Sequence, residues 1–249
     1  SRAVTINAPI FAAPTFTKDE NDNFWVFFGT GRFLSDPDKV IGYTNYLVGY
    51  KDPCWNGSCN TTYTLGNFTN TTNATVQATI TAIKKVCTCN ASSCGLVDVA
   101  YKTTPVTSYD EVSRGWYIAF TNPREAIFSQ PFIYGNTLDA LSFEPSNNVC
   151  IPGGTTKLIS LNYKSGTVNP NPAVYSPLAV QGTIAVGQTV TMQSKIPLGF
   201  GSPPLGNPFQ VAPTVGQEIK KFIQLSGGIV IELPQYGGLG GRFISWIEK

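Results

Sequence analysis

The sequence contains no histidine and few charged residues. None of the 249 residues is histidine, and Asp, Glu, Lys and Arg together make up only 13% of the chain. Histidine is the side chain that acid–base catalysis near neutral pH most often uses. The carboxylates that lie close together in the sequence are Asp19/Glu20/Asp22, Asp36/Asp38 and Asp110/Glu111. All are in turn-like contexts, where Asp bonds to its own backbone, so we expect no enzyme activity and no catalytic residue.

Signals of other function classes are also missing. The net charge is +2 with no basic run, which argues against a nucleic-acid partner. No apolar stretch approaches the roughly 18 residues that a membrane-spanning helix needs. The glycine-rich residues 237–241 lack the strand-then-helix context of a dinucleotide site, so we expect no cofactor. No signal peptide is present at Ser1, and we interpret the chain as part of a longer secreted protein.

The acidic row at residues 19–23 favours a hairpin turn over a calcium site. A calcium loop of the EF-hand type needs ligands at alternating positions and glycine at the sixth position. Here Phe24 stands at that position. We therefore expect no metal site in this chain.

Six cysteines indicate disulfide bonds. Their even number in a charge-poor chain favours an oxidising compartment over an all-cysteine zinc site, because the spacings differ from zinc knuckles. The pairing stays open, since six cysteines allow 15 arrangements. The candidates are Cys54, Cys59, Cys87, Cys89, Cys94 and Cys150.

Strand signals dominate the remaining sequence. Short runs of β-branched and aromatic residues alternate with Gly, Pro, Asn and Asp, which predicts an all-β sandwich or propeller. Residues 24–29 are apolar on both faces, as in a strand inside a sheet or between packed blades. Residues 75–86 fit a strand, with one short helix as the alternative. Further strands are expected at 116–120, 127–134, 156–163, 183–193 and 219–233.

One segment is unusual in composition. Residues 53–83 contain no charged side chain, and residues 60–75 are mostly Asn and Thr. We interpret residues of about 53–95 as an inserted loop region, tied by cysteines, within a single domain of residues 1–249. A variable binding loop at Asn60–Thr75 is the sharper alternative.

Three motifs stand out along the chain. Residues 27–33 read Phe-Phe-Gly-Thr-Gly-Arg-Phe, residues 115–118 read Gly-Trp-Tyr-Ile, and residues 242–246 read Arg-Phe-Ile-Ser-Trp. Taken in this order, the motifs resemble the C-terminal β-propeller of the PilY/PilC family of type IV pilus proteins. Arg124-Glu125 resembles the charged pair after the family's Gly-Trp strand, with the order reversed. The motif residues, which we expect to be structural, are Gly29, Thr30, Gly31, Gly115, Trp116, Ser245 and Trp246.

The resemblance implies a modified seven-bladed propeller with antiparallel blades, of which this chain is the later part. It implies a non-enzymatic extracellular protein at the pilus tip that acts in assembly, control of retraction and adhesion. The implied partners are pilins or minor pilins and a host or abiotic surface. Many family members carry a calcium loop, which lies upstream of the Phe-Gly-Thr-Gly strand, so the resemblance allows calcium binding in the full-length protein and not in this chain. A structural subunit of another extracellular assembly, or less favourably a quinoprotein-type enzyme, are the alternatives.

Overall fold

The structure is a computed structural model in which the following residues are described: 4–35, 38, 43–55, 57, 61–89, 94–106, 110–146, 153–168, 184–212, 220–228 and 230–234. These residues form strands and one short 3₁₀ helix, η2 (Leu65–Asn67), with no α-helix among them. The predicted all-β class is confirmed. No described helix could cross a membrane.

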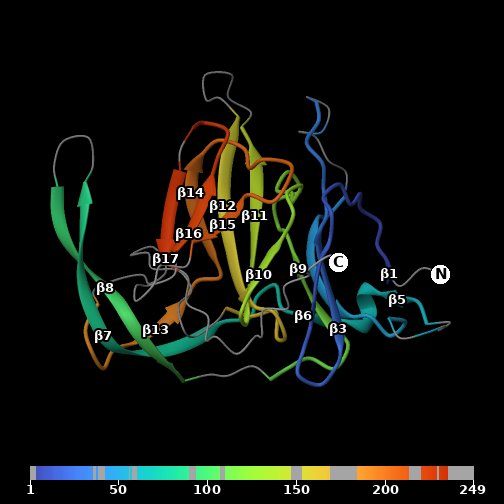
Figure 1. Cartoon of the computed structure of the whole chain (residues 1–249), viewed down its shortest axis with the longest axis horizontal. Helices are drawn as coiled ribbons and strands as arrows, with labels where there is room; N and C mark the ends of the chain where they lie inside the picture. The colour runs from blue at the N-terminus through green and yellow to red at the C-terminus, as the bar shows by residue number, and fades with distance from the viewer. Residues whose placement is uncertain are drawn as a thin grey trace, which may run out of the picture.

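Three sheets form the body of the molecule (Figure 1). The N-terminal sheet has the strand order β2 (Thr15–Lys18), β3 (Phe24–Gly29), β4 (Tyr46–Lys51), β9 (Gly115–Ala119), β6 (Thr69–Asn70). The central sheet has the order β10 (Phe132–Tyr134), β11 (Thr137–Pro145), β12 (Gly154–Asn162), β14 (Lys195–Phe200). The C-terminal sheet consists of β15 (Phe209–Ala212), β16 (Lys220–Gln224) and β17 (Val230–Pro234).

Two apolar cores lie between these sheets. One joins Trp25, Phe27 and Trp116 of the N-terminal sheet to Leu138 and Ile159 of the central sheet. The second joins the opposite face of the central sheet to the C-terminal sheet, and it contains Leu141, Leu158, Ile196, Phe209, Ile223 and Leu225. Because side chains of a strand alternate between the two faces, the central sheet is apolar on both. It is therefore the middle of three stacked layers.

A long two-stranded ribbon projects from the body (Figure 1). It consists of β7 (Val76–Cys89) and β8 (Cys94–Pro105), and β13 (Thr189–Met192) pairs with the start of β7. A small core at the base contains Val76, Ile80 and Val190. From residue 82 onward the two strands pair only with each other among the described residues.

The predicted strands are largely present, with different bounds. Strand 24–29 is confirmed, and the helix alternative at 75–86 is wrong because these residues belong to β7. The predicted strand at 219–233 is two strands, β16 and β17, separated by a turn at residues 225–228. The predicted strand at 183–193 shortens to β13, and the one at 127–134 shortens to β10.

The predicted inserted loop contains regular structure. Strand β5 (Tyr63–Thr64) pairs with β1 (Val4–Thr5), and β6 pairs in parallel with β9. Phe68 between them is buried against Tyr50 and Phe28 of the N-terminal sheet. The described residues 61–75 therefore complete the body, and the part that projects is the β7–β8 ribbon.

Candidate functional site

The Gly29-Thr30-Gly31 motif is a buried junction between the N-terminal and central sheets. A Cβ on Gly29 would overlap the Ile127 side chain, and a Cβ on Gly31 would overlap Ala126. Thr30 is fully buried, and its hydroxyl donates to Asn45 Oδ1 at 3.2 Å and accepts from the Tyr46 N–H at 2.7 Å. The motif holds backbone segments together, and it presents no group to solvent.

Asn45 connects this junction to a buried carboxylate, Glu125. The Asn45 amide donates to the Glu125 carbonyl at 3.0 Å. The Glu125 carboxylate forms ion pairs with Lys195 Nζ at 2.8 Å and Lys157 Nζ at 3.5 Å. It also accepts a hydrogen bond from the Ser142 hydroxyl at 2.5 Å. Burial acts to raise the pKa of Glu125, but the charges of both lysines and the hydrogen bonds from Lys195 and Ser142 hold it below its usual value.

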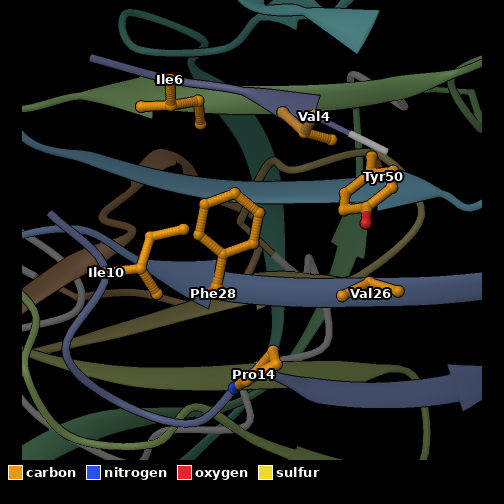
Figure 2. Close-up of a pocket in the computed structure, with 7 residues that line it drawn as sticks. All are labelled: Val4, Ile6, Ile10, Pro14, Val26, Phe28 and Tyr50. Atoms are coloured by element: carbon orange, nitrogen blue, oxygen red, sulfur yellow. The ribbon is translucent and has the colours of Figure 1, made fainter. Parts of the chain in front are cut away.

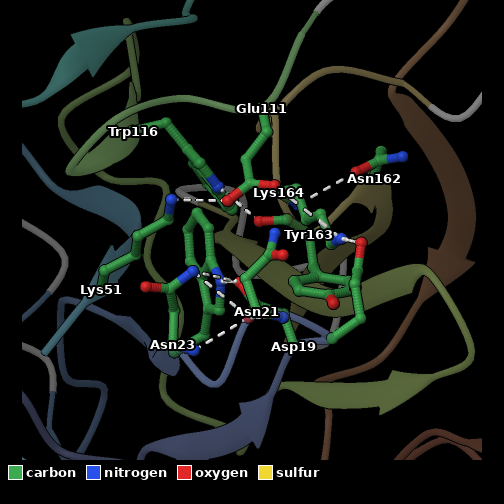
Figure 3. A network of polar contacts seen from close by, with 11 residues as sticks. Asp19, Asn21, Asn23, Lys51, Glu111, Trp116, Asn162, Tyr163 and Lys164 are labelled. Carbon is green, nitrogen blue, oxygen red and sulfur yellow. Dashed lines mark hydrogen bonds and ion pairs between the residues drawn. The ribbon is translucent and has the colours of Figure 1, made fainter.

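Asp19 organises a second polar network (Figure 3). Its carboxylate accepts the backbone N–H groups of Asn21 and Asn23, both at 2.9 Å, and the indole N–H of Trp25 at 2.8 Å. Residue Asp22 at the apex has a φ of 64°. The acidic row at residues 19–23 is therefore the predicted hairpin, in which Asp19 closes the turn onto the core.

Two lysines and two glutamates surround this hairpin at the surface. Lys51 contacts Glu111 at 2.5 Å, while Lys164 lies 3.8 Å from Glu111 and also binds Glu20 (Figure 3). Each lysine is paired, so the network offers no free cation. No group of three or more metal-ligating side chains occurs among the described residues.

An apolar groove of about 320 Å³ lies on the outer face of the N-terminal sheet (Figure 2). Its lining residues are Val4, Ile6, Ile10, Pro14, Val26, Phe28 and Tyr50. Burial, with a contribution from the charge of Asp52, raises the pKa of Tyr50 to about 12, so its phenol is neutral. Apart from the Tyr50 phenol, the lining side chains are apolar, so the groove offers surface for an apolar ligand or side chain.

An exposed aromatic row is formed by three rings of the same sheet and the loop after it. Phe16 stacks on Phe24 with ring centroids 5.4 Å apart, and Phe24 stacks on Trp55 at 6.1 Å. Lys18 Nζ lies 4.8 Å from the Trp55 ring. Phe16 is 64% exposed and Trp55 42%, so this row is an accessible apolar surface.

The residues named from the sequence have different places in the structure. Gly115 and Trp116 are buried in the core, where the Trp116 indole donates to the Tyr163 carbonyl at 2.7 Å. Cys54 is disulfide-bonded. The strand register places Cys89 opposite Cys94, and Cys87 opposite Leu96. Four of the named residues lie outside the described part of the chain: Cys59, Cys150, Ser245 and Trp246.

One buried charged pair was not anticipated from the sequence. Lys221 and Asp139 are both fully buried, with Nζ and Oδ2 2.6 Å apart. The signals that could have indicated it are a carboxylate between Leu138 and Ala140 in β11 and a lysine beside Phe222 in β16.

Comparison with known proteins identifies the fold. The sequence matches no protein-family model, and no curated protein matches it at a significant level. The structure is similar to the crystal structure of the Pseudomonas aeruginosa PilY1 C-terminal domain, with a TM-score of 0.54 and 15% sequence identity over 93% of this chain. The fold is that of the PilY1 C-terminal domain. This chain spans 45% of the length of the PilY1 structure.

The similarity to PilY1 agrees with the resemblance that the sequence motifs predicted. At 15% identity it establishes the fold, and function depends on the site. The described residues of these motifs, residues 29–31, Gly115 and Trp116, are buried. The groove and the aromatic row are accessible surfaces.

Proposed function

We propose that this chain is a non-enzymatic interaction module of a type IV pilus system. The observation that carries the proposal is the PilY1 C-terminal fold over 93% of the chain. The absence of histidine from the sequence supports a binding role over a catalytic one. The module acts outside the cell, at the pilus tip, in pilus assembly, control of retraction and adhesion.

We propose pilins or minor pilins and a host or abiotic surface as the partners. The ribbon supports this role because, in the part of the chain that the structure describes, residues 82–102 of β7 and β8 pair only with each other. The outer edge of such a ribbon can pair with a strand of another protein. The groove and the aromatic row add accessible apolar surface on the N-terminal sheet. The chain needs no cofactor of its own, and calcium binding belongs to the intact protein if it occurs.

Immunogold electron microscopy of native cells, with antibody raised against this domain, tests the location. Gold at the ends of thin surface filaments is the expected result. Gold along filament shafts would favour a structural subunit of the assembly. Gold confined to the periplasm, or protein found only in the medium, would contradict the proposal.

A ribbon variant of the full-length protein tests the surface. Residues 82–102 are replaced by a short turn. Gly206→Ala serves as the control, because a Cβ added at Gly206 meets nothing within 4 Å. We expect the ribbon variant to reach the surface but to lose attachment or twitching motility, while the control behaves as the parent. Unchanged attachment and motility in the ribbon variant would indicate that the groove or the aromatic row, and not the ribbon, is the binding surface.

A further inference from the structure

A buried charged pair links the central and C-terminal sheets. Lys221 of β16 and Asp139 of β11 are 82 positions apart in the sequence, and their Nζ and Oδ2 atoms are 2.6 Å apart. Both side chains are 0% exposed. The pair therefore lies entirely inside the molecule, where it cannot contact a binding partner.

The surroundings of this pair are apolar. Phe132 occupies the register position opposite Asp139, and its ring stacks on Phe209 with centroids 5.5 Å apart. Lys221 Nζ lies 5.9 Å from the Phe209 ring. Moving two ions from water to such a site costs several kcal/mol for each ion. A buried pair is stabilising only where further hydrogen bonds satisfy the remaining polar atoms.

Within the described ranges, two polar atoms at this site lack such hydrogen bonds. Asp139 Oδ1 and Ser160 Oγ are buried and have no hydrogen-bond partner among the described residues. Ser160 is opposite Asp139 in the β11–β12 register, which places the two side chains on the same face with Cβ atoms about 5 Å apart. Glu125, in contrast, has partners on both carboxylate oxygens. An unsatisfied buried polar atom in a native fold requires an explanation.

We propose that Lys221 and Asp139 condense to form a side-chain amide, a covalent link between the two sheets. The condensation takes place between the neutral amine and the neutral acid, the forms that cost least to bury among apolar side chains. The lysine amine is then a nucleophile adjacent to the carboxyl carbon of Asp139. A C–N bond forms and one C–O bond breaks. The departing oxygen leaves as water with the acid proton and one amine proton, so no oxidant or other reactant is required.

Ser160 has a specific place in this step. Negative charge develops on the carboxyl oxygen that stays with Asp139. The Ser160 hydroxyl is a buried donor on the same face of the sheet, and it stabilises this charge when its side chain turns toward that oxygen. In the amide product, the Ser160 hydroxyl can donate to the new carbonyl oxygen. The amide product therefore leaves no buried charge at this site.

Mass spectrometry of the intact, reduced and denatured protein tests the proposal. The expected mass is lower than that of the sequence by about 18 Da, the mass of one water. Trypsin should no longer cut after Lys221, and tandem mass spectrometry should find a branched peptide that joins Lys221 to Asp139. A full sequence mass, or a deficit without the branched peptide, would overturn the proposal.

Three comparisons sharpen the experiment. Lys221→Arg keeps the positive charge but cannot form the amide, so its mass should equal that of its sequence. The Lys195–Glu125 pair is the control inside the chain. Lys195 is 32% exposed, and both carboxylate oxygens of Glu125 have partners, so no link is expected there.

Ser160→Ala tests the part of the hydroxyl. It should reduce the fraction of protein that is linked at early times about tenfold, and an unchanged fraction would show that Ser160 takes no part in the reaction. The wild-type measurement is decisive even if a variant fails to fold.

Discussion

Gly31 shows how a single glycine can be required for two separate physical reasons. Its φ is +116°, a value that L side chains rarely adopt. A Cβ at this position would also overlap the Cβ of Ala126. Backbone strain and overlap therefore add at one residue of the motif that connects the N-terminal and central sheets.

We expect Gly31→Ala to lower the free energy of unfolding by about 3 kcal/mol, combining strain and overpacking. Gly187→Ala is the matched control, because Gly187 also has a positive φ of +86° but nothing lies within 4 Å of its added Cβ. The control should lose only about 1 kcal/mol. Urea unfolding measures both, and equal losses would show that the overlap with Ala126 is relieved at no cost.

Glu125 should make stability depend on pH. Its pKa in the folded protein is lowered below 4.5, so the carboxylate contributes stability that is present above the unfolded value. This contribution is lost as the pH falls through the folded pKa. Glu125→Gln should be less stable than the parent at pH 7 and should show a shallower loss of stability below about pH 4.5.

Thermal unfolding between pH 7 and pH 3 measures this difference. Glu20→Gln is the control, since Glu20 is 68% exposed and solvent screens its pair with Lys164. If the stability of the parent and of Glu125→Gln changes in parallel with pH, the Glu125 carboxylate has the same pKa in the folded and unfolded chains.

At the scale of elements, the β2–β3 hairpin depends on one side chain. Asp19 accepts two backbone N–H groups of the turn and the indole N–H of Trp25. The hydrogen bonds from the turn to the Asp19 carboxylate are local in the sequence and stabilise the turn itself. The hydrogen bond from Trp25 attaches the hairpin to the core. The element and the core are therefore coupled through a single carboxylate.

Asp19→Ala should lower the free energy of unfolding by about 2–3 kcal/mol, because it leaves the buried Trp25 N–H without a partner. Asp22→Asn is the matched control in the same hairpin. Asn tolerates the positive φ of this position, and the Lys18–Asp22 pair that it removes is exposed and contributes little. Chemical unfolding followed by tryptophan fluorescence compares the two, and equal effects would show that the indole finds another acceptor.

For the whole molecule, the separate cores imply two levels of stability. Ile159 belongs to the core that contains Trp25 and Trp116. Ile80 belongs to the small core at the base of the ribbon. Ile159→Ala should lower the tryptophan-monitored unfolding free energy by about 2–5 kcal/mol.

Ile80→Ala, which removes the same atoms from a residue that is equally buried, should mainly speed hydrogen exchange of the β7–β8 amides. Its tryptophan-monitored midpoint should stay close to that of the parent. A matching loss of that midpoint would show that ribbon and body unfold as one cooperative unit.

The sequence by itself determined the all-β class, the β2–β3 hairpin and the strand at residues 24–29, because these depend on local alternation and turn chemistry. Its motifs also indicated the PilY1-like fold. Several features were decided only by the tertiary structure. Residues 61–75 became part of the body, since pairing of β6 with β9 and burial of Phe68 outweigh their loop-like composition. The contact of Lys221 with Asp139 depends on which sheets stack, and residues 82 positions apart carry no local signal of their meeting.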